Sequence, residues 1–262
     1  MENKYLGRDD APFGAETWNL LDNMMVGVAK SSLSGRKILP LEGPFGFGLK
    51  GVPLNDTQGK DGVAKSGFIP VQALTVPFTL GKRDLAAFER DHLPVSLNDV
   101  ALAVMDIAAK EDSIIFSGSQ GAPGLLNASG SSSLTLSKWD KIGTAADQVI
   151  EGVTKLDEAG FHGPYTMALS PAQYNLLLRR YPQGEGTELE HIESIVTGGI
   201  VKAPSLKKGG VLLAADRAVA TIVLGQDMKI GYSGPTDDCL NFYVSESLAL
   251  IINIPQAVCV LK

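Results

Sequence analysis

Apolar residues recur at three- and four-residue intervals over residues 15–32, and that spacing predicts an amphipathic helix. Its apolar face is formed by Trp18, Leu21, Met25 and Val28. Leu20 and Met24 lie off this face, so the helix either contacts something beyond its own core or is a core helix covered on two sides. The same periodicity predicts helices at residues 84–91, 96–112 and 144–159.

Capping residues mark where several helices begin and end. Ser96, with Asp99 three residues later, is suited to open the helix over residues 96–112. Gly160 is suited to end the helix over residues 144–159 in a left-handed conformation. Two further helices are predicted to open at Ser170 with Pro171 and at Thr187 with Glu190.

Runs of β-branched and aromatic residues predict the strands. Residues 165–169 form one such run, residues 114–116 a shorter one, and the chain from Ile200 onward is almost entirely strand-like. The runs in this last part are VLLAA, ATIVLG, LNFYVSE, SLALIIN and AVCVL. Helices and strands grouped in this way, without an internal repeat, predict an α+β protein.

Residues 43–67 form a segment that cannot build a core of its own. The segment holds seven glycines and two prolines and is otherwise largely polar. The apolar run at residues 68–80 follows it, and Pro70 and Pro77 restrict that run to a bent or edge strand. A long hairpin that cannot bury itself is either a mobile loop or an arm on a neighbouring subunit, and its apolar return strand favours the arm.

Composition and charge narrow the function classes. With 44% hydrophobic and 20% charged residues, the 262-residue chain is expected to fold as a water-soluble protein. Its net charge of −6 argues against binding of a phosphate backbone, so no nucleic-acid partner is expected. The N-terminal MENKYLGRDDAPFG has no apolar run, which predicts no membrane partner and a cytoplasmic location. Cys239 and Cys259 lack metal-ligand spacing and are predicted to be reduced thiols.

The candidate catalytic motifs are incomplete, so no enzyme is predicted. GPFGFG at residues 43–48 has the glycines of a phosphate loop but opens no predicted helix, and it is interpreted as a turn. The serine-rich stretches contain no GxSxG elbow. Adjacent carboxylates such as Glu111 and Asp112 are expected to point apart or into water. None of the histidines stands in a metal-binding spacing; they are His92, His162 and His191.

Longer motifs, in order along nearly the whole chain, resemble those of encapsulins, a family also known under the linocin bacteriocin name. After Trp18, Leu21 and Asp22 in the first helix, the motifs are LSGRKIL, EGPFGF, VPFTL and the ED.IIF.G pattern over residues 111–118. In the second half they are EAGFHGPYTMAL, TGGIVKAPSL, LGQDMKIGY and IPQAVCVL.

The resemblance implies the fold of tailed-phage major capsid proteins, the Hong Kong 97 type, with an axial domain, a peripheral domain and an extended loop. The chain would then divide into an N-terminal helix with the start of the peripheral domain (residues 1–47), an extended loop (48–80), the long helix of the peripheral domain (81–132), an axial domain (133–224) and C-terminal strands of the peripheral domain (225–262).

The resemblance also implies a shell function. The chain would assemble with itself, in 60 copies or a quasi-equivalent multiple, into an icosahedral nanocompartment. The shell would enclose cargo enzymes of ferritin-like or peroxidase type, with roles in iron storage or oxidative stress, through a C-terminal peptide on the cargo. The alternatives are a phage or prophage major capsid protein and, less favoured, a hydrolase or bacteriocin.

Site residues follow from the same resemblance. The cargo-peptide groove would use Arg36 and Ile230, with Leu33, Ile38, Asp227 and Tyr232 as further candidates. The five-fold pore would be lined by Arg179, Arg180, Tyr181, Pro182, Gln183, Gly184, Glu185 and Gly186. Some relatives stack a flavin on a tryptophan where this chain has Arg83, and a guanidinium lacks the same apolar surface, so no cofactor is predicted. No metal is predicted either.

Overall fold

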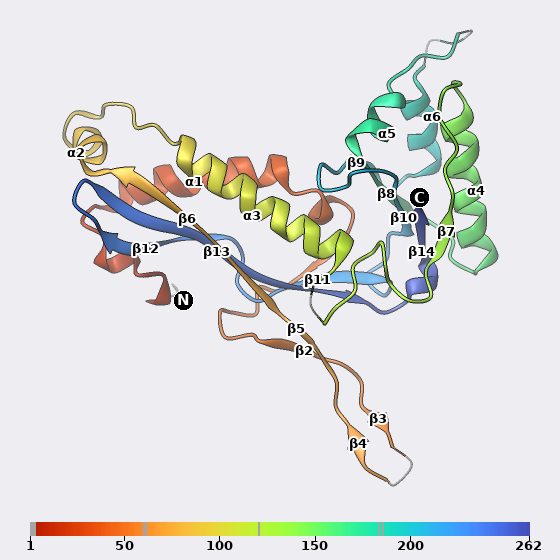
Figure 1. The fold of residues 1–262 in the computed structure, drawn as a ribbon, viewed down its shortest axis with the longest axis horizontal. Helices are drawn as coiled ribbons and strands as arrows, with labels where there is room; N and C mark the ends of the chain where they lie inside the picture. The colour runs from red at the N-terminus through yellow and green to blue at the C-terminus, as the bar shows by residue number, and fades with distance from the viewer. Residues whose placement is uncertain (1–3, 60–61, 120, 183, 185) are drawn as a thin grey trace. The chain divides into compact units, whose positions relative to one another are not determined.

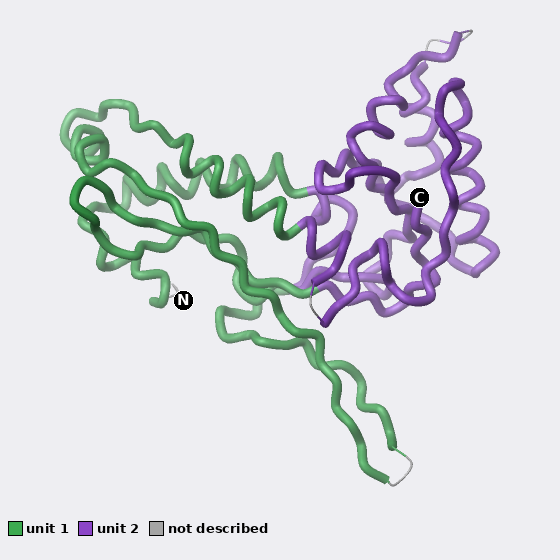
Figure 2. Tube along the Cα trace, viewed as in Figure 1, with its two compact units in different colours: residues 1–33, 43–111, 224–249 green, residues 34–42, 112–223, 250–262 purple. Residues whose placement is uncertain are grey.

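The computed structural model describes residues 4–59, 62–119, 121–182, 184 and 186–262. The chain divides into two compact units, which Figure 2 shows in different colours. Unit 1 comprises residues 1–33, 43–111 and 224–249, and unit 2 comprises residues 34–42, 112–223 and 250–262. Residues 112–132 and 250–262 belong to the same compact unit as residues 133–223. The division into axial domain, peripheral domain and extended loop stays a prediction.

Unit 1 is built on an antiparallel sheet whose central strand is β13 (Cys239–Ile252). β13 pairs with β12 (Lys229–Pro235) on one side and with β6 (Gln72–Gly81) on the other. The helices α1 (Ala15–Ser32) and α3 (Asn98–Ser117) lie along the sheet (Figure 1). The remaining elements of unit 1 are η1 (Lys4–Leu6), η2 (Arg8–Asp10) and α2 (Lys82–Asp91).

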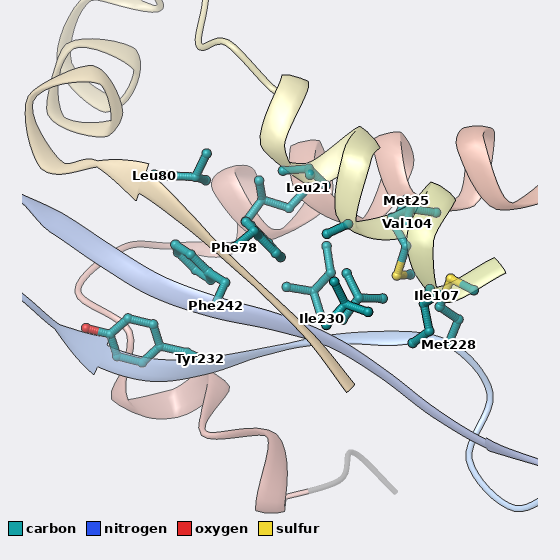
Figure 3. Close-up of a cluster of buried hydrophobic side chains, with 14 of the residues drawn as sticks. Leu21, Met25, Phe78, Leu80, Val104, Ile107, Met228, Ile230, Tyr232 and Phe242 are labelled. Atoms are coloured by element: carbon teal, nitrogen blue, oxygen red, sulfur yellow. The ribbon is translucent and has the colours of Figure 1, made fainter. Parts of the chain in front are cut away.

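The core of unit 1 forms between these two helices and the sheet (Figure 3). Alternate residues of β6 point into it, as a half-buried strand requires: Val76, Phe78 and Leu80 are buried, while Pro77 and Thr79 between them are exposed. The Phe242 ring stacks on Phe78 at a centroid distance of 5.2 Å. Phe242 also lies within 6.1 Å of the aromatic rings of Phe13, Trp18 and Tyr232. The core of unit 1 thus has an aromatic centre on its middle strand.

The N-terminal segment packs against β12. Arg8 Nε donates a hydrogen bond of 2.9 Å to the carbonyl oxygen of Ile230, and the same guanidinium pairs with Asp22 of α1. Its carbon Cζ lies 4.2 Å from the centroid of the Trp18 ring. Gly7 has φ +65°, and a Cβ there would lie 2.6 Å from the carbonyl oxygen of Tyr232, so only glycine fits this approach. Arg8 thereby holds α1 and β12 together.

Residues 48–71, here called the arm, extend from unit 1 as a two-part ribbon (Figure 1). β2 (Gly51–Pro53) pairs with β5 (Phe68–Pro70), and β3 (Thr57–Gln58) pairs with β4 (Ala64–Lys65). Phe68 is 69% exposed and Val63 is 68% exposed. The prediction that this segment builds no core of its own is therefore confirmed for its described residues.

Unit 2 contains a mixed sheet in the order β7-β14-β10-β8-β9. Its strands are β7 (Ser132–Leu134), β8 (Tyr165–Leu169), β9 (Ile200–Lys202), β10 (Gly210–Ala214) and β14 (Val258–Leu261). A short parallel pair joins β1 (Leu41–Glu42) to β11 (Ala220–Leu224). The helical segments are η3 (Gly35–Lys37), α4 (Thr144–Glu158), α5 (Pro171–Leu176), α6 (Glu188–Ile195) and η4 (Pro255–Ala257).

Most of the predicted caps are confirmed in unit 2. Ser170 accepts a hydrogen bond from the backbone of Gln173 at the start of α5. Thr187 and Glu190 form a complete capping box at the start of α6. Gly160 follows α4 with φ +89°. The mixed helices and sheets confirm the α+β class.

Three local predictions are wrong. Residues 114–116 continue α3 instead of forming a strand, because Ile115 and Phe116 fall on its buried face. The runs LNFYVSE and SLALIIN are one strand, β13, because its central polar residues are buried and bonded to Gln226 instead of forming a turn. Glu111 and Asp112 do not point into water: they are 0% and 2% exposed.

Asp112 has a structural role that explains its burial. Its carboxylate accepts hydrogen bonds from the backbone N–H of Ser34 at 3.1 Å and of Gly35 at 2.8 Å, and from the Ser34 hydroxyl at 2.7 Å. These bonds fix the turn that precedes η3.

Across the described residues, no helix is long and apolar enough to cross a membrane.

Truncation of Phe242 tests the aromatic centre of unit 1. Phe242→Ala should reduce the free energy of unfolding by about 3–5 kcal/mol, because it leaves a cavity among four aromatic rings. Phe242→Leu keeps much of the apolar volume and should lose less than about 1.5 kcal/mol. Denaturant titrations followed by circular dichroism would measure both, and a loss below about 1 kcal/mol for Phe242→Ala would show that this ring is not a centre of the core.

Candidate functional site

The loop that follows α5 is the first candidate site, and a buried carboxylate anchors its base. Glu188, the first residue of α6, is 0% exposed. Its Oε1 accepts hydrogen bonds from the backbone N–H of Gly143 at 2.9 Å, of Ala145 at 3.0 Å and of Ala146 at 3.2 Å. These donors lie at the N-terminus of α4, where the helix dipole favours a negative charge. Glu188 therefore joins the first turns of two helices.

Arg179 supplies the positive partner of this carboxylate at the start of the loop. Its Nη2 lies 3.5 Å from Glu188 Oε2. The same side chain donates to two backbone carbonyls, that of Leu176 at 2.8 Å and that of Asp140 at 3.2 Å. The backbone N–H of Glu188 in turn donates to the carbonyl of Arg179 at 3.0 Å. The two ends of the loop are therefore joined to each other by the contacts between Arg179 and Glu188.

Beyond this base the predicted pore-loop residues are more accessible. Arg180, Pro182 and Gly184 are exposed, and Gly186 is half-buried. The hydroxyl of Tyr181 lies 2.9 Å from His191 Nδ1, and burial raises the pKa of this phenol. Gln183 and Glu185 lie outside the described residues.

The histidines do not form a metal site. Within the described ranges, no group of three or more histidine, cysteine, aspartate or glutamate side chains is placed to hold a metal ion.

His162 Nδ1 lies 2.9 Å from Asp157 Oδ1, and the Tyr165 hydroxyl donates to the same oxygen at 2.5 Å. The Tyr165 bond, followed by that of His162, lowers the pKa of Asp157, whereas burial and the Asp157 bond raise the pKa of Tyr165 to about 12. These bonds close the turn before β8.

The residues predicted for a cargo-peptide groove are mostly buried. Ile230 is 0% exposed, Leu33 6% and Tyr232 8%, and all three belong to the core of unit 1 shown in Figure 3. Ile38 is 3% exposed and belongs to unit 2. A buried side chain has no surface to offer a peptide, so in this structure these four residues are core residues.

Two of the predicted groove residues keep some accessible surface. Arg36 lies in η3 of unit 2 and is half-buried. Asp227 lies in unit 1 and is also half-buried, and its Oδ1 accepts a hydrogen bond of 2.9 Å from the backbone of Met228. Arg83, the position tied to the flavin prediction, is exposed at the start of α2.

Leu20 and Met24, the residues predicted to lie off the apolar face of α1, are half-buried. Val26, on another side of the same helix, is 43% exposed. Arg8 fixes this helix through Asp22 and Trp18, a role that the sequence interpretation missed. No sequence signal pointed to it, because Arg8 and Asp22 lie on separate segments.

An exposed aromatic cluster was also missed. Tyr5 is 66% exposed, Phe45 63% and Phe47 56%, and the rings of Tyr5 and Phe47 stack at 5.6 Å. The segment GPFGFG, predicted as a turn, carries two of these rings. Its backbone is held by hydrogen bonds from Phe45 N–H to the Leu224 carbonyl and from Gly46 N–H to the Gly225 carbonyl. The signal was the pair of phenylalanines in a glycine-rich turn.

Comparisons with known proteins give one consistent result. The sequence model of the family described as "Encapsulating protein for peroxidase" matches residues 2–249. A type 1 encapsulin shell protein of Myxococcus xanthus is 31% identical, with 98% of this chain and 96% of the relative covered. A diheme-cytochrome-encapsulin shell fusion protein of Kuenenia stuttgartiensis is 30% identical, with 94% of this chain and 73% of that protein covered.

Solved structures show the same fold. A virus-like particle from Pyrococcus furiosus matches with a TM-score of 0.77 at 23% identity, covering 95% of this chain and all of that chain. The capsid of Myoviridae phage XM1 matches with a TM-score of 0.59 at 10% identity, covering 86% of this chain and 90% of that chain. The predicted tailed-phage capsid fold is therefore confirmed.

Removal of the Glu188 carboxylate tests the loop anchor. Glu188→Ala should lower the free energy of unfolding of unit 2 by about 3 kcal/mol, because it leaves Arg179 without its ion-pair partner and three backbone N–H groups without their acceptor. Glu193→Ala removes the same charge from an exposed position of α6 and should change stability by less than about 0.5 kcal/mol. Denaturation followed by fluorescence of the buried Trp139 would compare them, and equal stabilities would contradict the anchor.

A charge at Ile230 tests whether this residue is core or groove. Ile230→Asp should prevent folding, because a carboxylate in a fully buried position costs several kcal/mol. Lys229→Asp changes the neighbouring exposed residue of β12 and should leave the fold intact. Soluble yield and circular dichroism would separate the two variants. A soluble, folded Ile230→Asp protein would show that the side chain faces a groove, as the sequence interpretation predicted.

Proposed function

The chain belongs to the encapsulin family, the encapsulating proteins, and from that premise we propose that its copies close into a hollow icosahedral shell around cargo enzymes. The observation that carries this proposal is the arm. Phe68 and Val63 lie exposed on a ribbon that has no core of its own. Exposed apolar surface of this kind marks a site where another molecule binds and covers it.

Closed symmetry is the arrangement that covers every arm. If each arm lies on an equivalent neighbour, no arm is left over once the shell is complete. The proposed particle therefore contains 60 copies of the chain or a quasi-equivalent multiple. The family match distinguishes this proposal from a phage or prophage capsid protein, because the phage capsids share the fold at low sequence identity.

The proposed cargo is a peroxidase or a ferritin-like enzyme, held by a peptide at its C-terminus. The family description names a peroxidase as the enclosed protein, which supports the first choice. For docking of the peptide we propose the accessible side of α1, around Val26, because a short apolar anchor needs exposed apolar surface. Asp227 of the same unit is retained as a polar contact, whereas Arg36 belongs to unit 2 and stays a separate prediction. The buried Ile230, Leu33, Ile38 and Tyr232 are assigned to the cores of their own units.

Loop 179–186 is proposed to line a pore of the shell. Arg180 is exposed next to a base that Glu188 fixes, so an accessible loop residue stands on a rigid support. The shell is proposed to be a cytoplasmic compartment without a bound flavin. Cys239 and Cys259 are free thiols, which supports the proposal of a reducing compartment. No catalytic role is proposed for the shell itself.

Two matched deletions test the shell function. Replacing residues 55–66 by two glycines keeps the β2–β5 pair but removes the tip of the arm, and it should convert large particles into small oligomers. Deleting residues 183–186 shortens the loop and should leave the particles intact while small molecules enter faster. Negative-stain images and light scattering would measure both.

The unmodified protein provides the decisive control in this experiment. It should appear as closed hollow particles of uniform diameter. A monodisperse monomer at working concentration would overturn the proposed function. Loss of particles on deletion of residues 183–186 would show that this loop is an assembly contact and not a pore lining.

A further inference from the structure

A small pocket opens on unit 2, between two turns that have no part in the proposed function. Its volume is about 210 Å³. Residues 160–164, between α4 and β8, line one side, and residues 214–216, 218 and 219, between β10 and β11, line another. Ile254 completes the lining, so every lining residue belongs to unit 2. Pockets for drug-sized ligands measure about 300–1,000 Å³, so this one suits a ligand of few atoms.

Backbone hydrogen bonds hold the walls of the pocket in place. Ala215 N–H donates to the Pro164 carbonyl at 2.8 Å, which joins the two turns. Ile254 N–H donates to the Val219 carbonyl at 3.2 Å. The apolar part of the lining consists of Phe161, Ala214, Val219 and Ile254. The pocket is therefore formed before any ligand arrives, and it offers apolar surface to the stem of a ligand.

His162 supplies a hydrogen-bond acceptor in this lining. Its Nδ1 lies 2.9 Å from Asp157 Oδ1, and the pKa of Asp157 is lowered by the bond from Tyr165 and then by that from His162. Because the carboxylate is ionised, Nδ1 of the neutral imidazole carries the proton that it donates, and Nε2 keeps its lone pair. The side chain of His162 is 76% exposed, so Nε2 is accessible to a ligand.

Asp216 adds a negative charge from the other turn. Its Oδ1 accepts a hydrogen bond of 2.7 Å from the backbone N–H of Ala218, which fixes the direction of the carboxylate. The neighbouring cation, Arg217, bonds instead to the Leu41 carbonyl at 3.4 Å and lies 3.5 Å from Glu42 Oε1. The charge at the pocket therefore favours a cation.

These groups together match one ligand chemistry. A primary ammonium group has three N–H donors and no acceptor, so it can bind an imidazole nitrogen and a carboxylate at once. An alkyl stem behind it packs on the apolar lining while the charged head stays near water. An anion would instead be repelled by the carboxylates of Asp157 and Asp216.

We propose that this pocket binds small primary alkylammonium compounds, with the ammonium group facing His162 Nε2 and the Asp216 carboxylate and the stem on the apolar lining. The site lies within one copy of the chain, so it does not depend on the proposed shell function. Because the ligand is small and the ion pair is open to solvent, a dissociation constant on the order of 1 mM is expected. At that affinity, occupancy of the pocket follows the concentration of the amine around the protein.

Saturation-transfer NMR, which detects small ligands on large particles, tests the site with n-butylammonium as the probe. The protons of its stem should receive magnetisation from the protein. The compounds n-butanol and butyrate share the stem but carry no positive charge, and they should bind several-fold more weakly. Asp216→Asn should weaken butylammonium binding several-fold, whereas Asp140→Asn, at an exposed position of the same unit outside the pocket, should leave it unchanged. Equal binding of n-butanol or butyrate would overturn the proposal.

Ala218→Trp gives a second measurement that leaves the polar groups in place. Ala218 is an exposed lining residue, so a large ring there should fill the pocket and abolish binding while the circular dichroism stays unchanged. Undiminished binding to this variant would overturn the location. Binding to dissociated subunits but not to particles would show that a side chain of a neighbouring copy fills the pocket, and it would overturn the small-molecule ligand.

Discussion

The arm of residues 48–71 exposes Phe68 and Val63 to solvent. The rest of unit 1 holds the arm in a position where another chain can cover this apolar surface. Buried apolar surface is the main favourable term in association, so an uncovered ribbon favours contact with another chain. The other features of unit 1 make that contact reproducible. The strand β6, which continues directly from the arm, is held along its length by ten pairs with β13. The direction in which the arm leaves unit 1 is thereby fixed by the sheet.

Several charged side chains, half-buried or buried, fix local contacts within each unit. Arg8 joins α1 to β12 through Asp22 and the Ile230 carbonyl, and its guanidinium lies over the ring of Trp18. Within unit 2, Asp112 closes the turn at Ser34, and Glu188 joins α4 to α6. Removing one partner from such a buried pair leaves a charge without compensation, so each pair specifies one local arrangement. A shell subunit needs this uniformity, because small differences between copies would prevent closure.

Local patterns predicted much of this architecture. The helix over residues 15–32, the capping box of Thr187 and Glu190 and the strand over residues 165–169 depend on neighbouring residues, and all are confirmed. The errors arose where distant segments decide the outcome. The serines within β13 have the composition of a turn, but Gln226 satisfies their hydroxyls within the sheet. The functional residues show the same contrast between local and distant effects. The arm was predictable from its glycines, whereas the burial of Ile230 and the anchoring of Glu188 depend on tertiary contacts.

The central claim is that neighbouring copies cover the arm, and hydrogen exchange measured on the same protein in two states tests it most directly. Particles would be compared with subunits dissociated under mild conditions that preserve the circular dichroism of the fold. The account predicts that amides of residues 51–58 and 64–70 exchange slowly in particles and much faster in dissociated subunits, while amides of β8 and β10 exchange alike in both. Equal exchange of the arm amides in the two states would contradict it.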